Sequence, residues 1–205
     1  MSWGRVRGRA LVLPPGTEED AVSEFAEGSG SEKIHEVTAA PELGLTREVT
    51  WRLSPGHFLH YGRETPSGRS FVEVSGDDAE AVERMTDILV EYFEPLTDED
   101  LIAAVDAAES VEDLRRALVQ AGLGAPGNVD DRYVGRLTAA MRDPDPRIRE
   151  GGLWGAMYAL WPELLPAIRR IAETDDSDLL REQARALVDY YSKAGGSLPA
   201  PGGGS

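Results

Sequence analysis

Apolar residues recur along the carboxy-terminal half of the chain at the three- and four-residue spacing of amphipathic helices. Each apolar run follows a residue suited to cap a helix N-terminus. These caps are Thr97, Ser110, Asp130 or Asp131, Asp145 and Ser177. Gly122 is expected to end the helix that follows Ser110, and Pro162 interrupts the run after Trp161. The pattern predicts an all-helical unit over residues 96–194.

The amino-terminal half shows the two-residue period of half-buried strands. In residues 46–53, Val49, Trp51 and Leu53 alternate with polar residues. Glycine- and proline-containing turns separate this segment from its neighbours. Strands are also expected over residues 5–13, 34–37, 58–61 and 70–75. Strands joined by short turns predict an antiparallel meander.

Two helices are expected to accompany this sheet. Thr17 can cap a short helix that begins at Glu18, and the polar residues 27–33 predict a mobile loop after it. Asp77 and Glu80 have the spacing of a capping box. The helix after them should pack its apolar face on the meander, through Val82, Met85, Ile88, Leu89 and Tyr92. Residues 1–95 therefore predict a small antiparallel-sheet-plus-helix module, which resembles no family in pattern.

A short motif recurs 32 residues apart in the helical half. Residues 143–150 read DPDPRIRE, and residues 175–182 read DDSDLLRE, so that Arg149 aligns with Arg181. An acidic, proline-containing turn followed by a branched apolar residue and arginine resembles HEAT-like repeats, including those of the PBS-lyase type. The resemblance covers residues 130–194 and extends more loosely back to Thr97.

This resemblance implies a stack of helical hairpins, each opened by the acidic turn at its first helix. The chain has room for at most three hairpins, so the α+β module should cap one end of the stack. Gly151, Gly152 and Gly155 depart from the alanine that such repeats prefer, at about 1 kcal/mol each in a helix interior. They indicate either close helix packing or an irregular helix.

Composition narrows the class of partner. The formal net charge is −16 and is spread over both halves, which disfavours nucleic acid and anionic membranes and fits a basic protein partner. The chain has no cysteine, which excludes disulfides and thiolate chemistry. No apolar stretch has the length of a membrane span, so we expect a cytoplasmic protein. Residues 195–205 are rich in glycine, proline and serine and should be disordered.

Two groups of side chains are candidates for partner binding. Trp154, Tyr158 and Trp161 fall on one helical face, where they suit either a recognition patch or an inter-helix core; we favour the core. Arg5 and Arg7 share one face of the first strand with Arg9. This basic stripe suits either a carboxylate-rich partner or pairing with local acids, and we favour the local pairing.

Acidic residues of the repeated turns are a third candidate. Stacked hairpins would place equivalent turns side by side, so these residues would line one edge. Helix capping and compensation of the helix dipole explain most of them equally well, and we favour that interpretation. The residues are Asp143, Asp145, Asp175, Asp176 and Asp178.

The sequence contains no recognisable motif for catalysis or for metal binding. His57 and His60 lie three apart on a strand and so face opposite sides, and His35 is remote in sequence. The chain holds no glycine-rich phosphate loop, nucleophile elbow or zinc-protease helix. We therefore expect no catalytic residue, metal or cofactor, although paired carboxylates between the two halves remain an alternative.

The sequence thus predicts an α+β protein that works by protein–protein binding, as an adaptor or regulatory subunit with an acidic helical-repeat surface. An immunity or inhibitor protein that neutralises a basic toxin or nuclease is the first alternative, because it uses the same acidity. An enzyme with its active site between the two halves is the second.

Overall fold

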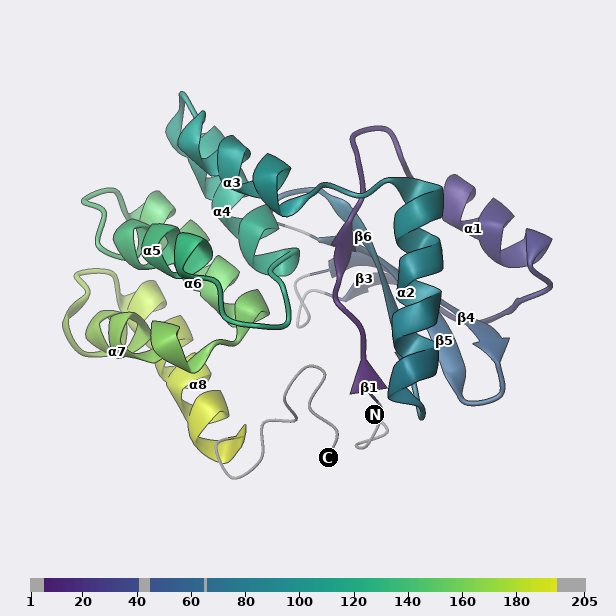
Figure 1. The fold of residues 1–205 in the computed structure, drawn as a ribbon. Coiled ribbons are helices and arrows are strands. Elements are labelled where there is room, and N and C mark those ends of the chain that lie inside the picture. The colour runs from purple at the N-terminus through teal and green to yellow at the C-terminus, as the bar shows by residue number, and fades with distance from the viewer. Residues whose placement is uncertain (1–5, 41–44, 65, 195–205) are drawn as a thin grey trace. The chain divides into compact units, whose positions relative to one another are not determined.

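The computed structural model describes residues 6–40, 45–64 and 66–194, and it combines an antiparallel sheet with helices (Figure 1). The mixed α+β class expected from the sequence is confirmed. The chain separates into two compact units, one ending at Leu96 and the other beginning at Thr97. Among the described residues, no helix is both long and apolar enough to cross a bilayer. The tail predicted to be disordered, 195–205, lies outside the described residues.

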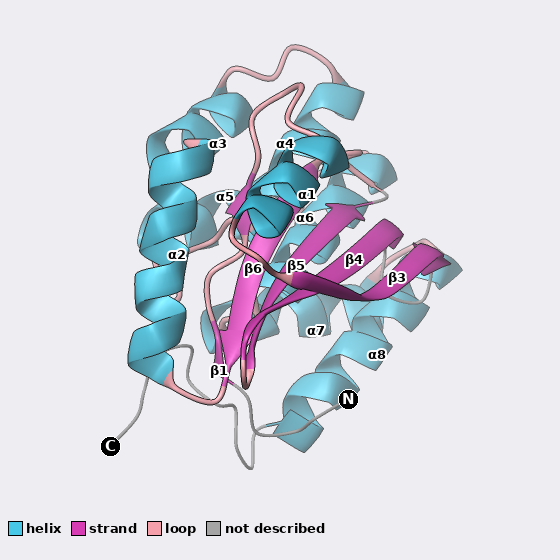
Figure 2. Ribbon diagram, turned by 90° about the vertical axis from the view of Figure 1, so that its right-hand side faces the viewer, coloured by secondary structure: helices cyan, strands magenta, loops and turns pink. Residues whose placement is uncertain are grey.

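The first unit is built on one antiparallel sheet. Its strands are β1 (Val6–Arg7), β2 (Leu11–Val12), β3 (Glu32–Ala40), β4 (Leu45–Ser54), β5 (His57–Glu64) and β6 (Ser70–Gly76). The order across the sheet is β1-β6-β5-β4-β3, and β2 also pairs with β6 (Figure 2). The predicted meander is therefore confirmed for β3 to β6, and the first strands extend its other edge.

The first strand is shorter and less regular than predicted. Arg7 pairs with Ser75 and Leu11 pairs with Val72, so the first segment holds one residue more than β6 does over this stretch. Such an extra residue is a bulge, which breaks the alternation of faces. At Gly8 the backbone N–H donates to the Val74 carbonyl oxygen at 2.8 Å. The predicted single strand over residues 5–13 is therefore two short ones.

Residues 27–33 are not a loop throughout, because helix and strand extend into them from both sides. Helix α1 (Glu19–Gly28) ends later than expected, and β3 begins at Glu32. Strand β3 is also longer than the predicted 34–37, since it pairs with β4 from Glu32 to Ala40. Long-range pairing with β4 thus decides the length of a strand whose own sequence signal is weak.

Helices α1 and α2 (Ala79–Phe93) pack on the same face of the sheet, over Trp51 and its apolar neighbours. Both N-caps differ by one residue from the prediction. Glu18 caps α1 without a side-chain hydrogen bond, and Asp78 rather than Asp77 caps α2. The first residues are placed by packing on the sheet, so a cap pattern alone locates them only to within a residue or two.

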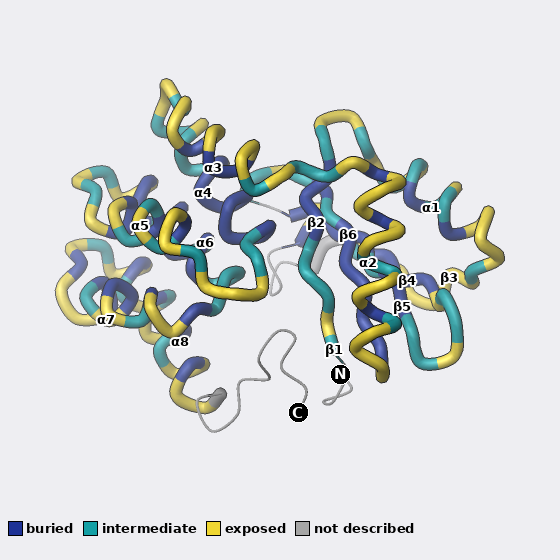
Figure 3. The backbone as a smooth tube through the Cα atoms, viewed as in Figure 1, coloured by how far each residue is buried: buried dark blue, intermediate teal, exposed yellow. Residues whose placement is uncertain are grey.

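The buried side of α2 is rotated from the predicted one. Val82, Leu89 and Phe93 are buried in the core, whereas Ile88 and Tyr92 are 53% and 56% exposed. Figure 3 shows this exposed side of α2 in yellow and teal. The prediction that Ile88 and Tyr92 pack on the meander is wrong, because the helix presents only a narrow stripe to the sheet.

The second unit consists of helices within its described part. They are α3 (Asp98–Asp106), α4 (Val111–Leu123), α5 (Asp131–Ala140), α6 (Pro146–Ala159), the 3₁₀ turn η2 (Pro162–Leu164), α7 (Leu165–Thr174) and α8 (Asp178–Ala194). Five predicted N-cap side chains accept backbone N–H groups, as those of capped helices do. They are Thr97, Ser110, Asp130, Asp145 and Ser177.

Consecutive helices pack on each other: α3 on α4, α5 on α6 and α7 on α8. In addition, α4 contacts α6, and α6 contacts α8. The motif at residues 143–150 lies in the turn between α5 and α6. It leads directly into α6, whose N-cap is Asp145, so the acidic turn opens a helix as the motif predicts.

Glycines bring α4 and α6 into backbone contact. A Cβ atom on Gly122 would lie 2.1 Å from the Gly155 carbonyl oxygen, and one on Gly155 would lie 2.6 Å from the Leu118 carbonyl oxygen. Helix α4 ends at Leu123 with Gly124 as its C-cap, so Gly122 lies in the last turn, one residue before the end. Of the two interpretations of the α6 glycines, the structure supports close helix packing.

We expect Gly155→Ala to lower the free energy of unfolding by roughly 3 kcal/mol, because the new methyl group would overlap backbone that cannot move independently. Gly135→Ala is the matched control, since a Cβ atom on this helical glycine of α5 meets nothing within 4 Å. The control should raise stability by about 0.5–1 kcal/mol through helix propensity. Urea unfolding of both variants measures the change in unfolding free energy, and equal changes would contradict the close contact between α4 and α6.

Candidate functional site

Two turns of the second unit repeat the same hydrogen bonds 32 residues apart, as the sequence motif does. The side chains of Asp143 and Asp175 each accept the backbone N–H two residues later, at 2.8 and 2.9 Å. Arg149 Nη1 donates to the Asp143 carbonyl oxygen at 2.9 Å, and Arg181 Nη1 donates to that of Asp175. Equivalent residues therefore form equivalent hydrogen bonds in both turns.

Arg149 also connects one turn to the next. Its Nε and Nη2 donate to the two Asp175 carboxylate oxygens at 2.8 and 3.0 Å. The two side chains are only 8% and 2% exposed. Burial opposes ionisation of Asp175, but hydrogen bonds from Arg149 and from the Ser177 N–H outweigh it and lower the pKa of Asp175. The carboxylate likewise raises the pKa of Arg149.

The predicted acidic residues divide into internal and exposed ones. Asp145 caps α6, and hydrogen bonds from the Arg147 side chain and backbone lower its pKa to about 2. Asp143 and Asp175 support the turns, as described above. Asp176 and Asp178 are 87% and 95% exposed, and each contacts one arginine. Capping and turn support thus account for three of the five, and the exposed pair remains accessible to a partner.

The three predicted aromatic residues do not share one helical face, because α6 ends at Ala159. Trp161 lies beyond the helix, is 3% exposed, and meets Tyr133 edge to face at 5.9 Å between ring centroids. Trp154 and Tyr158 are half-buried on α6, with their rings 6.2 Å apart. Trp161 therefore belongs to the core.

Of the predicted arginine stripe, the structure describes Arg7 and Arg9. Arg5 lies outside the described residues. Arg7 donates to Glu73 at 2.5 Å across the sheet, which agrees with the local pairing that we favoured. Arg9 lies between β1 and β2, in the stretch that holds the extra residue, and the face that it shares with Arg7 stays a prediction.

Histidines of the sheet are held by hydroxyl groups. His60 Nδ1 lies 3.2 Å from Thr50 Oγ1, and its Nε2 lies 2.8 Å from Ser75 Oγ. His35 pairs with Thr50 in the register, so a whole strand separates it from His60. His57 and His60 are not brought together. No group of three potential metal ligands occurs in the part of the chain that the structure describes.

An apolar groove in the first unit was missed by the sequence analysis. It has a volume of about 310 Å³ and lies where α1, β4 and α2 meet. The residues lining it are Phe25, Ser29, Ser31, Leu53, Met85, Ile88 and Leu89. The available signal was the width of the apolar stripe on α2, which exceeds what one sheet contact can bury.

Comparison with known proteins gives no relative: no protein-family model matches the chain, and neither a curated protein nor a solved structure matches it.

We expect Arg149→Met to lower the free energy of unfolding by about 3–5 kcal/mol, because it leaves the buried Asp175 carboxylate without its partner. Arg147→Met is the matched control, since Arg147 occupies the same helical turn and pairs with Asp145 but is 63% exposed. The control should change stability little. Urea unfolding at pH 7 measures both variants. Similar losses of unfolding free energy would contradict the assignment of Arg149 to a buried ion pair and Arg147 to an exposed one.

The wild-type protein should lose stability as the pH falls from about 5 to 2. Asp145 and Asp175 have folded-state pKa values below that of an unfolded aspartate, about 3.9, so their contribution is complete above that value and is lost on protonation. In Arg149→Met the unpaired Asp175 should titrate above its unfolded value. The difference in unfolding free energy between wild type and this variant should therefore shrink below pH 4. A difference that stays constant with pH would count against the ion pair.

Proposed function

We propose that the protein is an adaptor or regulatory subunit that binds a partner protein with a basic surface. The observation that carries this proposal is the distribution of charge. The basic side chains of both units are largely engaged by acids of their own unit, while many exposed carboxylates have no cation partner. Negative charge that is not neutralised internally is available to attract a basic partner.

The second unit illustrates this distribution. Many of its arginines form ion pairs with Glu99, Glu112 and aspartates of their own unit. Within the residues that the structure describes, several exposed carboxylates have no such pair. These are Glu109, Asp131, Glu173, Glu182 and Asp189. The excess of acid therefore lies on the surface of the unit.

We further propose that this unit is a HEAT-like stack of three hairpins. The recurrence of turn contacts at an offset of 32 residues supports this, because it makes the two turns equivalent in geometry as well as in sequence. The contacts of α3 with α5 and of α6 with α8 are those that neighbouring hairpins would make. Exposed Asp176 and Asp178, with half-buried Trp154 and Tyr158, are the proposed partner-binding residues of this stack.

Affinity capture from native lysate by the immobilised full chain tests the proposal. We expect a basic protein that binds at about 50 mM salt and is released near 300 mM, because screening weakens contacts between exposed charges. The identified partner is then titrated with the purified chain. Replacing Asp176 and Asp178 by asparagine should weaken binding by about tenfold, as expected for central interface residues.

The matched control replaces Glu109 by glutamine and Asp131 by asparagine, which removes the same charge elsewhere in the unit. Equal weakening by both double variants would contradict the assigned surface. A partner that resists elution, is encoded beside this chain and is toxic alone would favour an inhibitor. Absence of any protein partner, together with turnover of a small molecule, would overturn the proposal.

A further inference from the structure

We propose that the apolar groove of the first unit binds a partner segment that carries bulky apolar side chains on one face and lysine or arginine beside them. This inference rests on the proposed function, since it names the class of partner that the acidic protein accepts. It places binding on the sheet unit, separate from the proposed partner-binding residues of the helical unit.

The groove exists because α1 and α2 touch at one end and leave the sheet uncovered beside it. The Phe25 ring of α1 lies 4.7 Å from that of Tyr92 and 5.4 Å from that of Phe93, which closes the space at this point. Beside this contact, Leu53 of β4, Met85 and Leu89 line an open hollow. The groove thus has an apolar floor and aromatic residues at one end.

Its α2 wall exposes more apolar surface than the fold uses. Ile88 is 53% exposed and Tyr92 is 56% exposed, and Met85 lies one turn before Ile88 on the same side. Residues at this spacing span about 10 Å along a helix. A row of apolar side chains of that length matches the anchors of an amphipathic helix that lies in a groove. Exposed apolar residues gathered in a hollow mark such an interaction surface.

The charged residues on the two helices beside the groove are mostly acidic. Every charged residue from Glu18 to Glu27 is acidic, and on α2 the single cation, Arg84, is already paired with Glu80 at 3.4 Å. Exposed carboxylates without an ion pair, among the described residues, continue along both helices. They are Glu24, Glu27, Glu83, Asp87 and Glu91.

Charge complementarity therefore selects the occupant. A basic amphipathic segment would place its apolar side chains in the hollow and its cations near the carboxylates of α1 and α2. A second copy of the chain is the less favourable occupant, because each copy carries a net charge of −16 and brings acid to the same rim.

The probe for the test is a helical peptide of about 18 residues with leucines at the spacing of one face and lysines elsewhere. A scrambled peptide of the same composition and a leucine–glutamate peptide are the controls. We expect the leucine–lysine peptide to bind the full chain in the micromolar range and to shift the methyl resonances of Met85 and Ile88. The controls should bind at least about tenfold more weakly, since they lack the apolar face or the complementary charge.

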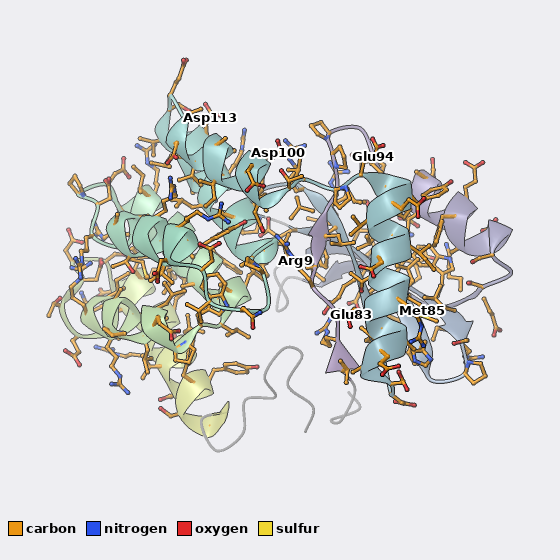
Figure 4. All side chains as sticks on the ribbon, in the orientation of Figure 1. Arg9, Glu83, Met85, Glu94, Asp100 and Asp113 are labelled. Atoms are coloured by element: carbon orange, nitrogen blue, oxygen red, sulfur yellow. The ribbon has the colours of Figure 1, made fainter. Side chains whose placement is uncertain are left out.

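Variants on α2 locate the site. Ile88→Arg should weaken binding of the leucine–lysine peptide at least about tenfold, whereas Val90→Arg should leave it unchanged, because Val90 is 44% exposed but does not line the groove. Asp87→Lys changes no residue that lines the groove. It should weaken peptide binding about threefold more than Glu83→Lys does, because salt screens the charge that lies farther from the groove more strongly. Figure 4 shows Glu83 and Met85 leaving α2 on opposite sides.

Equal loss in Ile88→Arg and Val90→Arg, or equal binding of the scrambled peptide, would overturn the proposal by showing non-specific attraction to an acidic protein. Self-association in sedimentation that Ile88→Arg abolishes would assign the groove to a second copy instead. If the native partner is lost with the Asp176 and Asp178 variant but retained by Ile88→Arg, the groove assignment fails while the proposed function stands.

Discussion

The contact between α4 and α6 is the constraint around which the helical unit is arranged. Glycines at positions 122 and 155 let the two backbones meet, and any side chain there would occupy the space of a carbonyl group. The glycines weaken the intrinsic helix propensity of both segments, so packing rather than propensity holds these helices. Helices α3 and α5 pack beside α4 and α6 as their partners.

Burial sorts the charged residues of this acidic protein into two populations. Arg149 and Asp175 form a buried, hydrogen-bonded pair that holds one turn to the next. Such a pair adds little net stability, because desolvation offsets much of its attraction, but losing one partner is costly because the other charge stays buried. The exposed carboxylates contribute little to stability but set the surface potential. The same residue type therefore has a structural role in the turns and a proposed recognition role on the surface.

The apolar groove and the acidic surface support the same kind of partner. Apolar area supplies most of the affinity in protein interfaces, while charge selects the partner and speeds its approach. On α1 and α2 both features occur together, since Phe25 and Ile88 lie in a hollow on helices whose exposed charges are almost all negative. A basic segment with an apolar face is the ligand that uses both.

Local patterns in the sequence determined the elements that depend on neighbouring residues. The N-caps of the helical unit and the repeated turn motif rest on contacts within a few residues, and the structure has them where the sequence predicts them. Such contacts can be recognised from spacing alone.

Tertiary packing decided which apolar residues are buried and how long the strands are, which the spacing of residues in the sequence does not determine. Whether Ile88 and Tyr92 face the core or the solvent depends on the rotation of α2 over the sheet, and their hydrophobicity is the same in either case. Glycine is a common helix-ending residue by sequence, and only the fold shows that Gly122 lies against the backbone of α6 at Gly155. Long-range pairing likewise set the length of β3 and the bulge before Leu11. The groove depends on residues from α1, β4 and α2, which only the fold brings together.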